Sequence, residues 1–123
     1  LKEAGITPAD VDHVNAGAGG SVELDAFEAR GIREVFGDAV PVFALRGQVG
    51  AMGAASGPVE LAASVLALRH GLLPGTVNHE TPDPACPIRV HVGDPRPVTK
   101  PYAVKLSYTD MGQCAAAVIR KAG

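Results

Sequence analysis

The chain has 123 residues, a mass of 12.5 kDa and a formal net charge of −2, and 46% of its residues are hydrophobic. This length allows one domain at most, or a part of one. Because the charge is small and negative and no basic patch is evident in the sequence, we expect neither nucleic acid nor a membrane as a partner. The two cysteines, Cys86 and Cys114, lack metal-ligand spacing, which predicts a reduced cytoplasmic chain without a metal or other cofactor.

The first twenty residues predict a helix end, a helical turn and a strand. Residues 1–5 have the character of a helix C-terminus stopped by Gly5, so we expect the chain to begin inside a longer polypeptide. Residues 7–10 supply a capping hydroxyl, a proline and an acid at the spacing of a single helical turn. Residues 11–16 predict a strand that runs directly into a glycine-rich segment, residues 17–20.

A helix over residues 22–36 and a strand over residues 40–45 are predicted next. Ser21 is the expected helix cap and Gly37 the expected stop. The apolar residues that we place on one face of this helix are Leu24, Phe27, Ile32 and Val35. Residues 40–45 are a continuous apolar run, typical of a strand buried on both faces. The alternation of strand and helix predicts parallel strands joined by right-handed crossovers.

We expect the fold to be organised around residues 46–70. A glycine-rich turn over residues 47–57 is followed by a predicted helix over residues 58–70, with Pro58 in its first turn. Apolar residues cover every side of this helix, which predicts that it is buried all round. Glu60, the proline and the glycines make the stretch a poor membrane span.

The last part of the chain predicts an irregular connector and an edge hairpin. Residues 71–87 are too rich in proline for regular structure, and residues 88–92 predict a short strand. Two apolar runs, residues 103–108 and 114–119, predict a hairpin at the edge of the sheet. The whole pattern indicates an α/β fold: a mixed sheet with parallel strands plus a C-terminal antiparallel hairpin, and helices on both faces.

These segments, in this order, are similar to those of a known family. The motifs are AGITPADVDHVNA, the acids Asp25 and Glu28, EVFG, the glycine- and alanine-rich turn with its helix, LLPGTVNHETPDPAC and the closing AAAVIR. On these residues the chain resembles the C-terminal half of a β-ketoacyl synthase, a thiolase-like condensing enzyme of fatty-acid and polyketide synthesis. The resemblance covers nearly all of residues 1–123 and implies two similar halves stacked in five layers. It places the apolar helix in the central layer and the nucleophilic cysteine in the other half.

The resemblance implies a histidine at two positions where this chain has none. Decarboxylative condensation uses two imidazoles that stabilise the enolate formed as carbon dioxide leaves. The family pattern N-A-H-G-T-G-T places the first histidine at Gly17, and the pattern K-S-x-x-G-H places its lysine at Arg46 and the second histidine at Ala51. Losing one such donor typically weakens transition-state stabilisation by about 3 to 4 kcal/mol. We therefore expect no intact catalytic residue.

A third departure from the family pattern lies in the closing hairpin. The family loop G-F-G-G-x-N, whose aromatic residue gates the acyl pocket, corresponds to residues 109–114, with Asp110, Met111 and Gly112 at the gate-loop positions. An acid at Asp110 does not suit an apolar acyl tunnel. The three departures together predict that the chain lacks ordinary condensing activity.

The four histidines have simpler interpretations than catalysis. We expect His13, inside a strand, to be structural, and His70, at a helix C-terminus, to be capping. His79 and His91 lie near the proline-rich connector and would form a His pair if they approached each other. Such a pair without carboxylate or cysteine support does not predict a metal site.

The remaining polar candidates also have structural interpretations. Cys86 and Cys114 have no neighbouring base in the sequence, and we interpret both as small buried hydrophobes. Asp25 and Glu28 lie one turn apart on a helix, and we expect Glu28 to hydrogen-bond the loop that the helix follows.

The glycines of residues 17–20 also resemble a phosphate-binding turn, but they lack the G-x-G-x-x-G spacing and a Walker lysine. We interpret them as the remnant of a catalytic loop. Arg46 is the exception among the candidates. Its fixed positive charge would lie beside the positions where the family stabilises the enolate oxygen. Such a charge would suit a carboxylate or phosphate of another ligand.

The sequence supports three hypotheses about function. In the first, the chain belongs to a non-catalytic partner or acyl-binding scaffold, similar to a chain-length factor, that works with its N-terminal half, an acyl carrier protein and an active synthase. In the second, it is part of an active 3-oxoacyl synthase or thiolase-like acyltransferase whose cysteine lies in that N-terminal half. In the third, it is an excised piece whose helix over residues 58–70 exposes an apolar flank, and dimers or aggregates would cover that flank.

Overall fold

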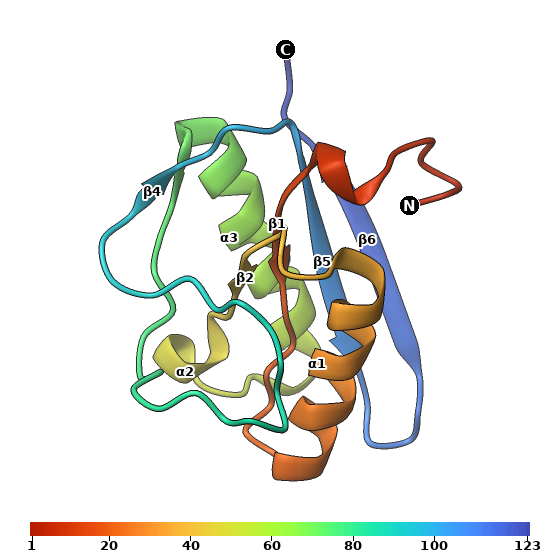
Figure 1. Cartoon of the computed structure of the whole chain (residues 1–123), viewed down its shortest axis with the longest axis vertical. Helices are drawn as coiled ribbons and strands as arrows, with labels where there is room; N and C mark the ends of the chain where they lie inside the picture. Colours follow the sequence, from red (N-terminus) through yellow and green to blue (C-terminus); the bar gives the residue numbers. More distant parts are fainter.

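A four-stranded sheet forms the centre of the computed structural model, which describes all 123 residues (Figure 1). Its strands, in order across the sheet, are β2 (Val42–Phe43), β1 (Val11–Asn15), β5 (Tyr102–Tyr108) and β6 (Cys114–Arg120). β1 is parallel to both of its neighbours, whereas β5 and β6 form an antiparallel hairpin with β6 at the edge. The predicted mixed sheet with a C-terminal hairpin is confirmed.

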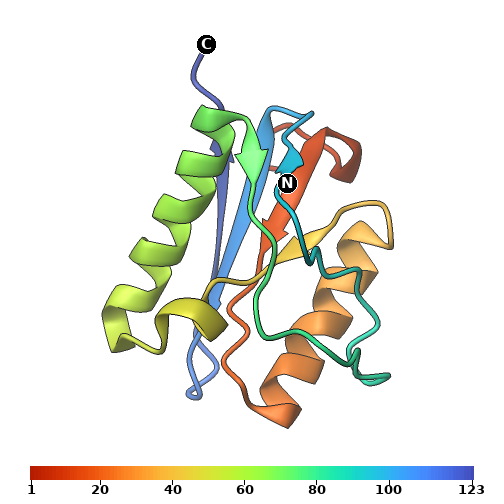
Figure 2. The ribbon, with the colours of Figure 1, turned by 90° about the vertical axis from the view of Figure 1, so that its left-hand side faces the viewer.

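Helices cover both faces of this sheet, as predicted (Figure 2). α1 (Val22–Phe36) lies on one face and α3 (Ser56–His70) on the other. The shorter elements are η1 (Pro8–Asp10), α2 (Arg46–Val49), η2 (Gly53–Ala55) and a second sheet of β3 (Leu72–Leu73) and β4 (Arg96–Pro97). The largest cluster of buried apolar side chains joins α1 to the parallel strands. None of the helices has the length and apolar character needed to cross a bilayer.

α1 has the predicted bounds but a different buried face. Its cap is the predicted Ser21, whose hydroxyl accepts a hydrogen bond from the Leu24 N–H at 3.4 Å. The residues that enter the core are Ala26, Ala29, Ile32 and Phe36. The predicted residues Leu24, Phe27, Ile32 and Val35 do share a face, but only Ile32 is fully buried, and Phe27 and Val35 are 64% and 50% exposed. The small alanines let the helix approach the sheet, while the larger side chains line a groove beside the β5–β6 hairpin.

α3 is not buried on all sides, which corrects the sequence prediction. Its face toward the sheet carries the buried residues Ser56, Glu60, Ser64, Ala67 and Leu68, so most of the buried positions are polar or small. The opposite face leaves Val59, Val65 and Leu66 between 38% and 51% exposed. Apolar side chains do surround the helix, but the four-stranded sheet covers only one side of it. The apolar flank anticipated by the third hypothesis is therefore exposed.

The segment between α3 and the hairpin is irregular, as its prolines predict. The strand expected over residues 88–92 is reduced to one parallel bridge between Val42 and Val90. The strand expected over residues 40–45 is limited to β2, although residues 40–43 are all buried as predicted. The pairing of β3 with β4 was not predicted, because two-residue strands carry no periodic pattern.

Residues 1–6 have the hydrogen bonds of a helix C-terminal cap. The Gly5 N–H donates to the Lys2 carbonyl at 3.1 Å, and the Ile6 N–H donates to the Leu1 carbonyl at 3.3 Å. Gly5 has φ +64°, and this combination is the Schellman motif that ends many helices. Leu1 and Ile6 pack against the main core cluster. These contacts agree with the helix stop predicted at Gly5.

Candidate functional site

The candidate site lies where β1 ends. The glycine-rich segment, residues 17–20, follows β1 directly, and α2 and the turn between β5 and β6 lie at the same end of the sheet, which is the lower end in Figures 1 and 2. The carboxyl ends of parallel strands are the usual place for ligand sites in α/β folds. The topology therefore gathers at one end the three segments that the family resemblance assigns to an active site.

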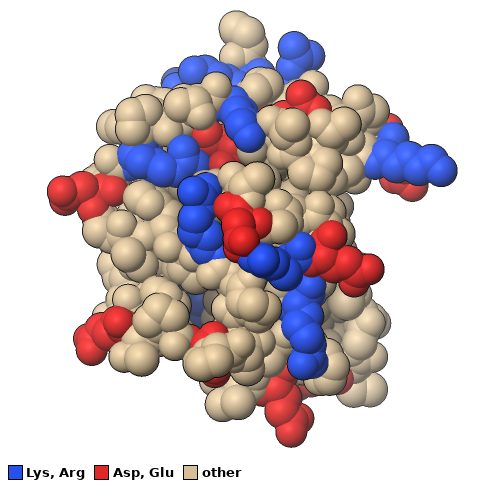
Figure 3. All heavy atoms as spheres, in the orientation of Figure 1, with Lys and Arg blue, Asp and Glu red and all other residues tan.

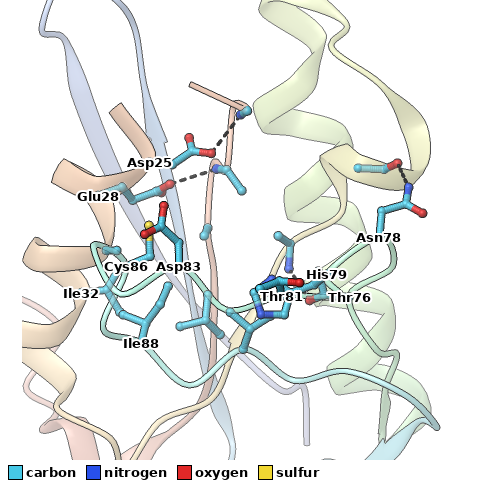
Figure 4. A pocket seen from close by; sticks show the side chains of 18 of the residues that line it. Asp25, Glu28, Ile32, Thr76, Asn78, His79, Thr81, Asp83, Cys86 and Ile88 are labelled. Atoms are coloured by element: carbon cyan, nitrogen blue, oxygen red, sulfur yellow. Dashed lines mark hydrogen bonds between the residues drawn. The ribbon is translucent and has the colours of Figure 1, made fainter. Parts of the chain in front are cut away.

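Two carboxylates of α1 hold the glycine-rich segment in place (Figure 4). Glu28 accepts hydrogen bonds from the N–H groups of Gly17 at 2.6 Å and Ala18 at 2.9 Å, and Asp25 accepts one from the Gly20 N–H at 3.0 Å. Burial raises the pKa of Glu28, and the two N–H donors oppose that change. These contacts agree with the structural role predicted for Glu28.

The aromatic ring of Tyr108 fills the space beside Gly17. A Cβ atom at position 17 would lie 2.9 Å from Cε1 of Tyr108 and 3.3 Å from Oε1 of Glu28. The ring is held by its hydroxyl, which donates to Oδ1 of Asp25 at 3.1 Å. Burial, followed by the nearby carboxylates, raises the pKa of Tyr108, so the hydroxyl remains protonated. Position 17 therefore has no room for a side chain unless Tyr108 moves.

Arg46 is paired with a buried carboxylate. Its Nε and Nη2 atoms each lie 2.9 Å from Oε1 of Glu60, and Nζ of Lys105 lies 2.6 Å from Oε2 of the same residue. The side chain of Glu60 is fully buried and that of Lys105 is 3% exposed. Burial lowers the pKa of Lys105, and the Glu60 carboxylate opposes this change. Of the Arg46 guanidinium, Nη1 faces the glycine-rich segment, 3.4 Å from a Cβ placed at Gly19.

The other predicted site positions are exposed. Ala51 lies between α2 and η2, and Asp110, Met111 and Gly112 lie in the turn between β5 and β6. Met111 is 88% exposed. The structure thus brings Arg46 to the glycine-rich segment, while the gate-loop side chains face solvent.

A cavity of about 360 Å³ lies between α1 and the irregular connector after β3, and Figure 4 shows its lining. Burial, and then the charge of Asp83, raises the pKa of Cys86, which disfavours the thiolate that a nucleophile needs. His79 lines this cavity, whereas His91 lines a different one, so the two histidines do not share a site. Cys114 is exposed on β6, which corrects the prediction that it is buried.

A buried polar chain connects β1 to α3 and β4. Nδ1 and Nε2 of His13 each lie 3.1 Å from their partners, which are Oδ1 of Asp12 and Oγ of Ser64. Nη2 of Arg96 pairs with Asp12 at 2.7 Å from the other side. His13 is fully buried in these contacts, in agreement with its predicted structural role.

Sequence reasoning missed the residues that decide the shape of the candidate site. Tyr108 and Lys105 were assigned only to an apolar strand, and Glu60 was used only as an argument against a membrane span. One available signal was that Glu60 is the single acidic residue of an otherwise apolar helix. An acidic residue that is surrounded by apolar residues on a helix requires partners from other elements when it is buried.

Asp12 predicts a stability change at acidic pH. Burial disfavours its charged form, but hydrogen bonds from His13, Thr99 and Arg96 outweigh burial and lower the pKa of Asp12 to about 2, from 3.8. Because the folded pKa is depressed, the stabilisation is complete above pH 3.8 and is lost as the pH falls through about 2. We expect the stability difference between the natural chain and Asp12→Asn to narrow by roughly 2 kcal/mol from pH 5 to pH 2, measured by urea unfolding.

The control for this measurement is Asp110→Asn, at an exposed turn position. Its stability difference from the natural chain should be the same at both pH values. A constant difference for Asp12→Asn across this range would contradict the prediction.

Comparisons with known proteins identify the family. The family model described as "Beta-ketoacyl synthase, C-terminal domain" matches residues 1–80. The chain belongs to the β-ketoacyl synthase family. The 3-oxoacyl-[acyl-carrier-protein] synthase 2 of Mycobacterium bovis is 40% identical to it over 109 residues, which are 88% of this chain and 26% of that protein. This β-ketoacyl synthase domain thus spans about a quarter of the length of that relative.

Solved structures of ketosynthases have the same fold as this β-ketoacyl synthase domain. A structure described as the ishigamide ketosynthase/chain length factor superimposes with a TM-score of 0.93 at 27% identity, over 100% of this chain and 31% of that one. A type II polyketide synthase acyl-carrier protein in complex with its ketosynthase gives a TM-score of 0.92 at 27% identity, over 100% of this chain and 31% of that one. The thiolase-like fold implied by the sequence resemblance is confirmed.

Proposed function

We propose that this chain is the C-terminal domain of a longer β-ketoacyl synthase homologue that does not carry out decarboxylative condensation. It acts in fatty-acid or polyketide synthesis as a non-catalytic partner or acyl-binding scaffold beside an active synthase. Two structural relatives support the choice of partners, because one is described as a ketosynthase/chain length factor and another contains an acyl-carrier protein in complex with its ketosynthase. The partners that we propose are an acyl carrier protein and a catalytic synthase subunit.

The observation that carries this proposal is the contact between Tyr108 and Gly17. The family resemblance implies an imidazole at position 17, but glycine has no side chain to donate a hydrogen bond, and the Tyr108 ring takes up the adjacent space. Glu28 occupies the other side. Ala51 likewise has no donor to offer an enolate oxygen. A site without either donor loses the largest single contribution to stabilising that charge.

Two features support the view that the chain works as part of a longer protein. The apolar flank of α3 is exposed, although a helix that is apolar on all sides is usually covered by protein. Residues 1–6 form the hydrogen bonds of a Schellman motif, which ends many helices, although no helix is formed there. A second apolar layer from another part of a longer protein would cover the flank of α3.

The test is a decarboxylation assay on the full-length protein that contains this domain. The purified protein is incubated with radiolabelled malonyl-carrier protein, and release of labelled carbon dioxide is measured. We expect no release above the rate without protein, because neither Gly17 nor Ala51 stabilises the enolate. An active β-ketoacyl synthase assayed in parallel shows that the substrate is competent.

Release at the rate of the active synthase would contradict the proposal and favour an active acyltransferase whose nucleophilic cysteine lies outside these residues. The scaffold role has its own measurement. Adding the full-length protein to an active synthase subunit and its acyl carrier protein should change the amount or chain length of the product. An unchanged product would contradict the partner role even if the protein is inactive alone.

A further inference from the structure

A polar cavity lies at the start of β1, away from the candidate site at its end. Its volume is about 470 Å³. Its charged and polar lining residues are Asp12, Arg89, His91, Arg96, Thr99 and Lys100. Asp12 and Gly17 are five residues apart along an extended strand, which corresponds to about 16 Å. We call this cavity the basic pocket.

The basic pocket has an excess of positive charge. Three of its residues, Arg89, Arg96 and Lys100, are cations, and Asp12 is its single carboxylate. The carboxylate of Asp12 already has partners. It forms an ion pair with Arg96 at 2.7 Å and accepts a hydrogen bond from the Thr99 N–H at 2.8 Å. Arg89 and Lys100 form no ion pair. Two cations of the pocket are therefore left without a carboxylate partner.

Neighbouring acids remove only part of this excess. The charge of Asp10 interacts with that of Lys100 but forms no ion pair with it, and the Asp10 carboxylate accepts hydrogen bonds from the backbone N–H and the hydroxyl of Thr7, each at 2.8 Å. Nη2 of Arg89 donates to the Ala39 carbonyl at 3.2 Å, which leaves its charge uncompensated. On the face shown in Figure 3, Lys and Arg side chains form a diagonal band, and acidic side chains lie both within it and around it.

Two buried nitrogen atoms of the pocket residues lack hydrogen-bond partners. They are Nε of Arg96 and Nε2 of His91. The Arg96 atom is always a donor, and the His91 atom is one when its ring carries the proton there. Buried donors are nearly always hydrogen-bonded in native proteins, so these two residues mark a polar lining that is not fully satisfied within the chain. Both residues line the same cavity.

We propose that the basic pocket binds a small oxyanion of the phosphate class. Phosphate oxygens accept several hydrogen bonds at once. They also carry the negative charge needed to pair with Arg89 and Lys100, which form no ion pair within the chain. The same chemistry is offered by free inorganic phosphate and by the phosphoryl group of a larger molecule. This inference is independent of the proposed function, because the pocket and the candidate site lie at opposite ends of β1.

The test is a titration of this chain with inorganic phosphate and, separately, with glycerol phosphate at constant ionic strength, followed by ³¹P NMR and calorimetry. We expect saturable binding with one site per chain. Arg89→Gln combined with Lys100→Gln should weaken binding about tenfold or more, because each charge-assisted hydrogen bond contributes strongly to affinity. Both positions reach the surface, so thermal unfolding of the double variant should match that of the natural chain.

The matched control is Arg69→Gln combined with Lys121→Gln, which removes the same charge from exposed positions outside the pocket. Its dissociation constant should stay within about twofold of the natural value. Equal weakening by both double variants, or no saturable binding of either compound, would overturn the proposal. Tighter binding of glycerol phosphate would assign the pocket to a phosphoryl group on a larger molecule, and equal or tighter binding of inorganic phosphate would assign it to the free ion.

Discussion

Replacing Glu60 with glutamine is expected to lower the free energy of unfolding by about 3 to 5 kcal/mol, the range found when one partner of a buried ion pair is removed. The Glu60 carboxylate is fully buried between Lys105 and Arg46, at 2.6 Å and 2.9 Å. Without its charge, the buried ammonium of Lys105 loses the carboxylate with which it forms an ion pair. The measurement is urea unfolding at pH 7. The free energies of unfolding of the natural chain and the variant are compared with one common m-value, the dependence of that free energy on urea concentration.

The matched control is Glu34→Gln, at an exposed position of α1, which should change stability by less than about 0.5 kcal/mol. A second variant separates charge from packing. Lys105→Met combined with Glu60→Gln removes both charges, so it should recover a large part of the loss caused by Glu60→Gln alone. If Glu60→Gln costs less than about 1 kcal/mol, the pair does not stabilise the fold in the way that its burial indicates.

Introducing a histidine at position 17 is expected to destabilise the chain by about 3 kcal/mol without restoring decarboxylation. A Cβ at this position would already lie 2.9 Å from the Tyr108 ring, and an imidazole adds further atoms in the same direction. Overpacking of this kind typically costs about 1 to 3 kcal/mol, and breaking the hydrogen bond from Tyr108 to Asp25 adds to that loss. Urea unfolding of this chain gives the stability change, and release of labelled carbon dioxide by the full-length protein with the same substitution gives the activity.

A double-mutant cycle tests whether Tyr108 is the cause. Tyr108→Ala opens the space beside Gly17, so Gly17→His should cost less in that background, with a coupling energy of about 1 to 3 kcal/mol. Gly31→His is the matched control, because a Cβ at Gly31 on α1 meets no atom within 4 Å. Additive effects of Gly17→His and Tyr108→Ala would show that the ring does not block position 17.

Much of the secondary structure could be predicted because its signals are local. Ser21 caps α1 and Gly37 ends it with φ 60°, and both requirements concern a few adjacent residues. The two apolar runs over residues 103–108 and 114–119 likewise predicted the β5–β6 hairpin. The order of motifs also indicated the family. The structure brings Arg46 beside the glycine-rich segment, since its Nη1 lies 3.4 Å from a Cβ placed at Gly19, and the use of these positions as a site stays a prediction.

The sequence alone thus determined the two long helices, the C-terminal hairpin, the order of the main elements and the family, because each of these follows from local backbone preferences and from motifs read along the chain. Only the tertiary structure decided which face of α3 is buried, that Tyr108 fills the space beside Gly17, and that Arg96 reaches Asp12, 84 positions away. The physical reason is that a buried charge or a filled space depends on partners from distant segments. Those partners are chosen by the packing of the sheet and its helices, and no local pattern encodes them.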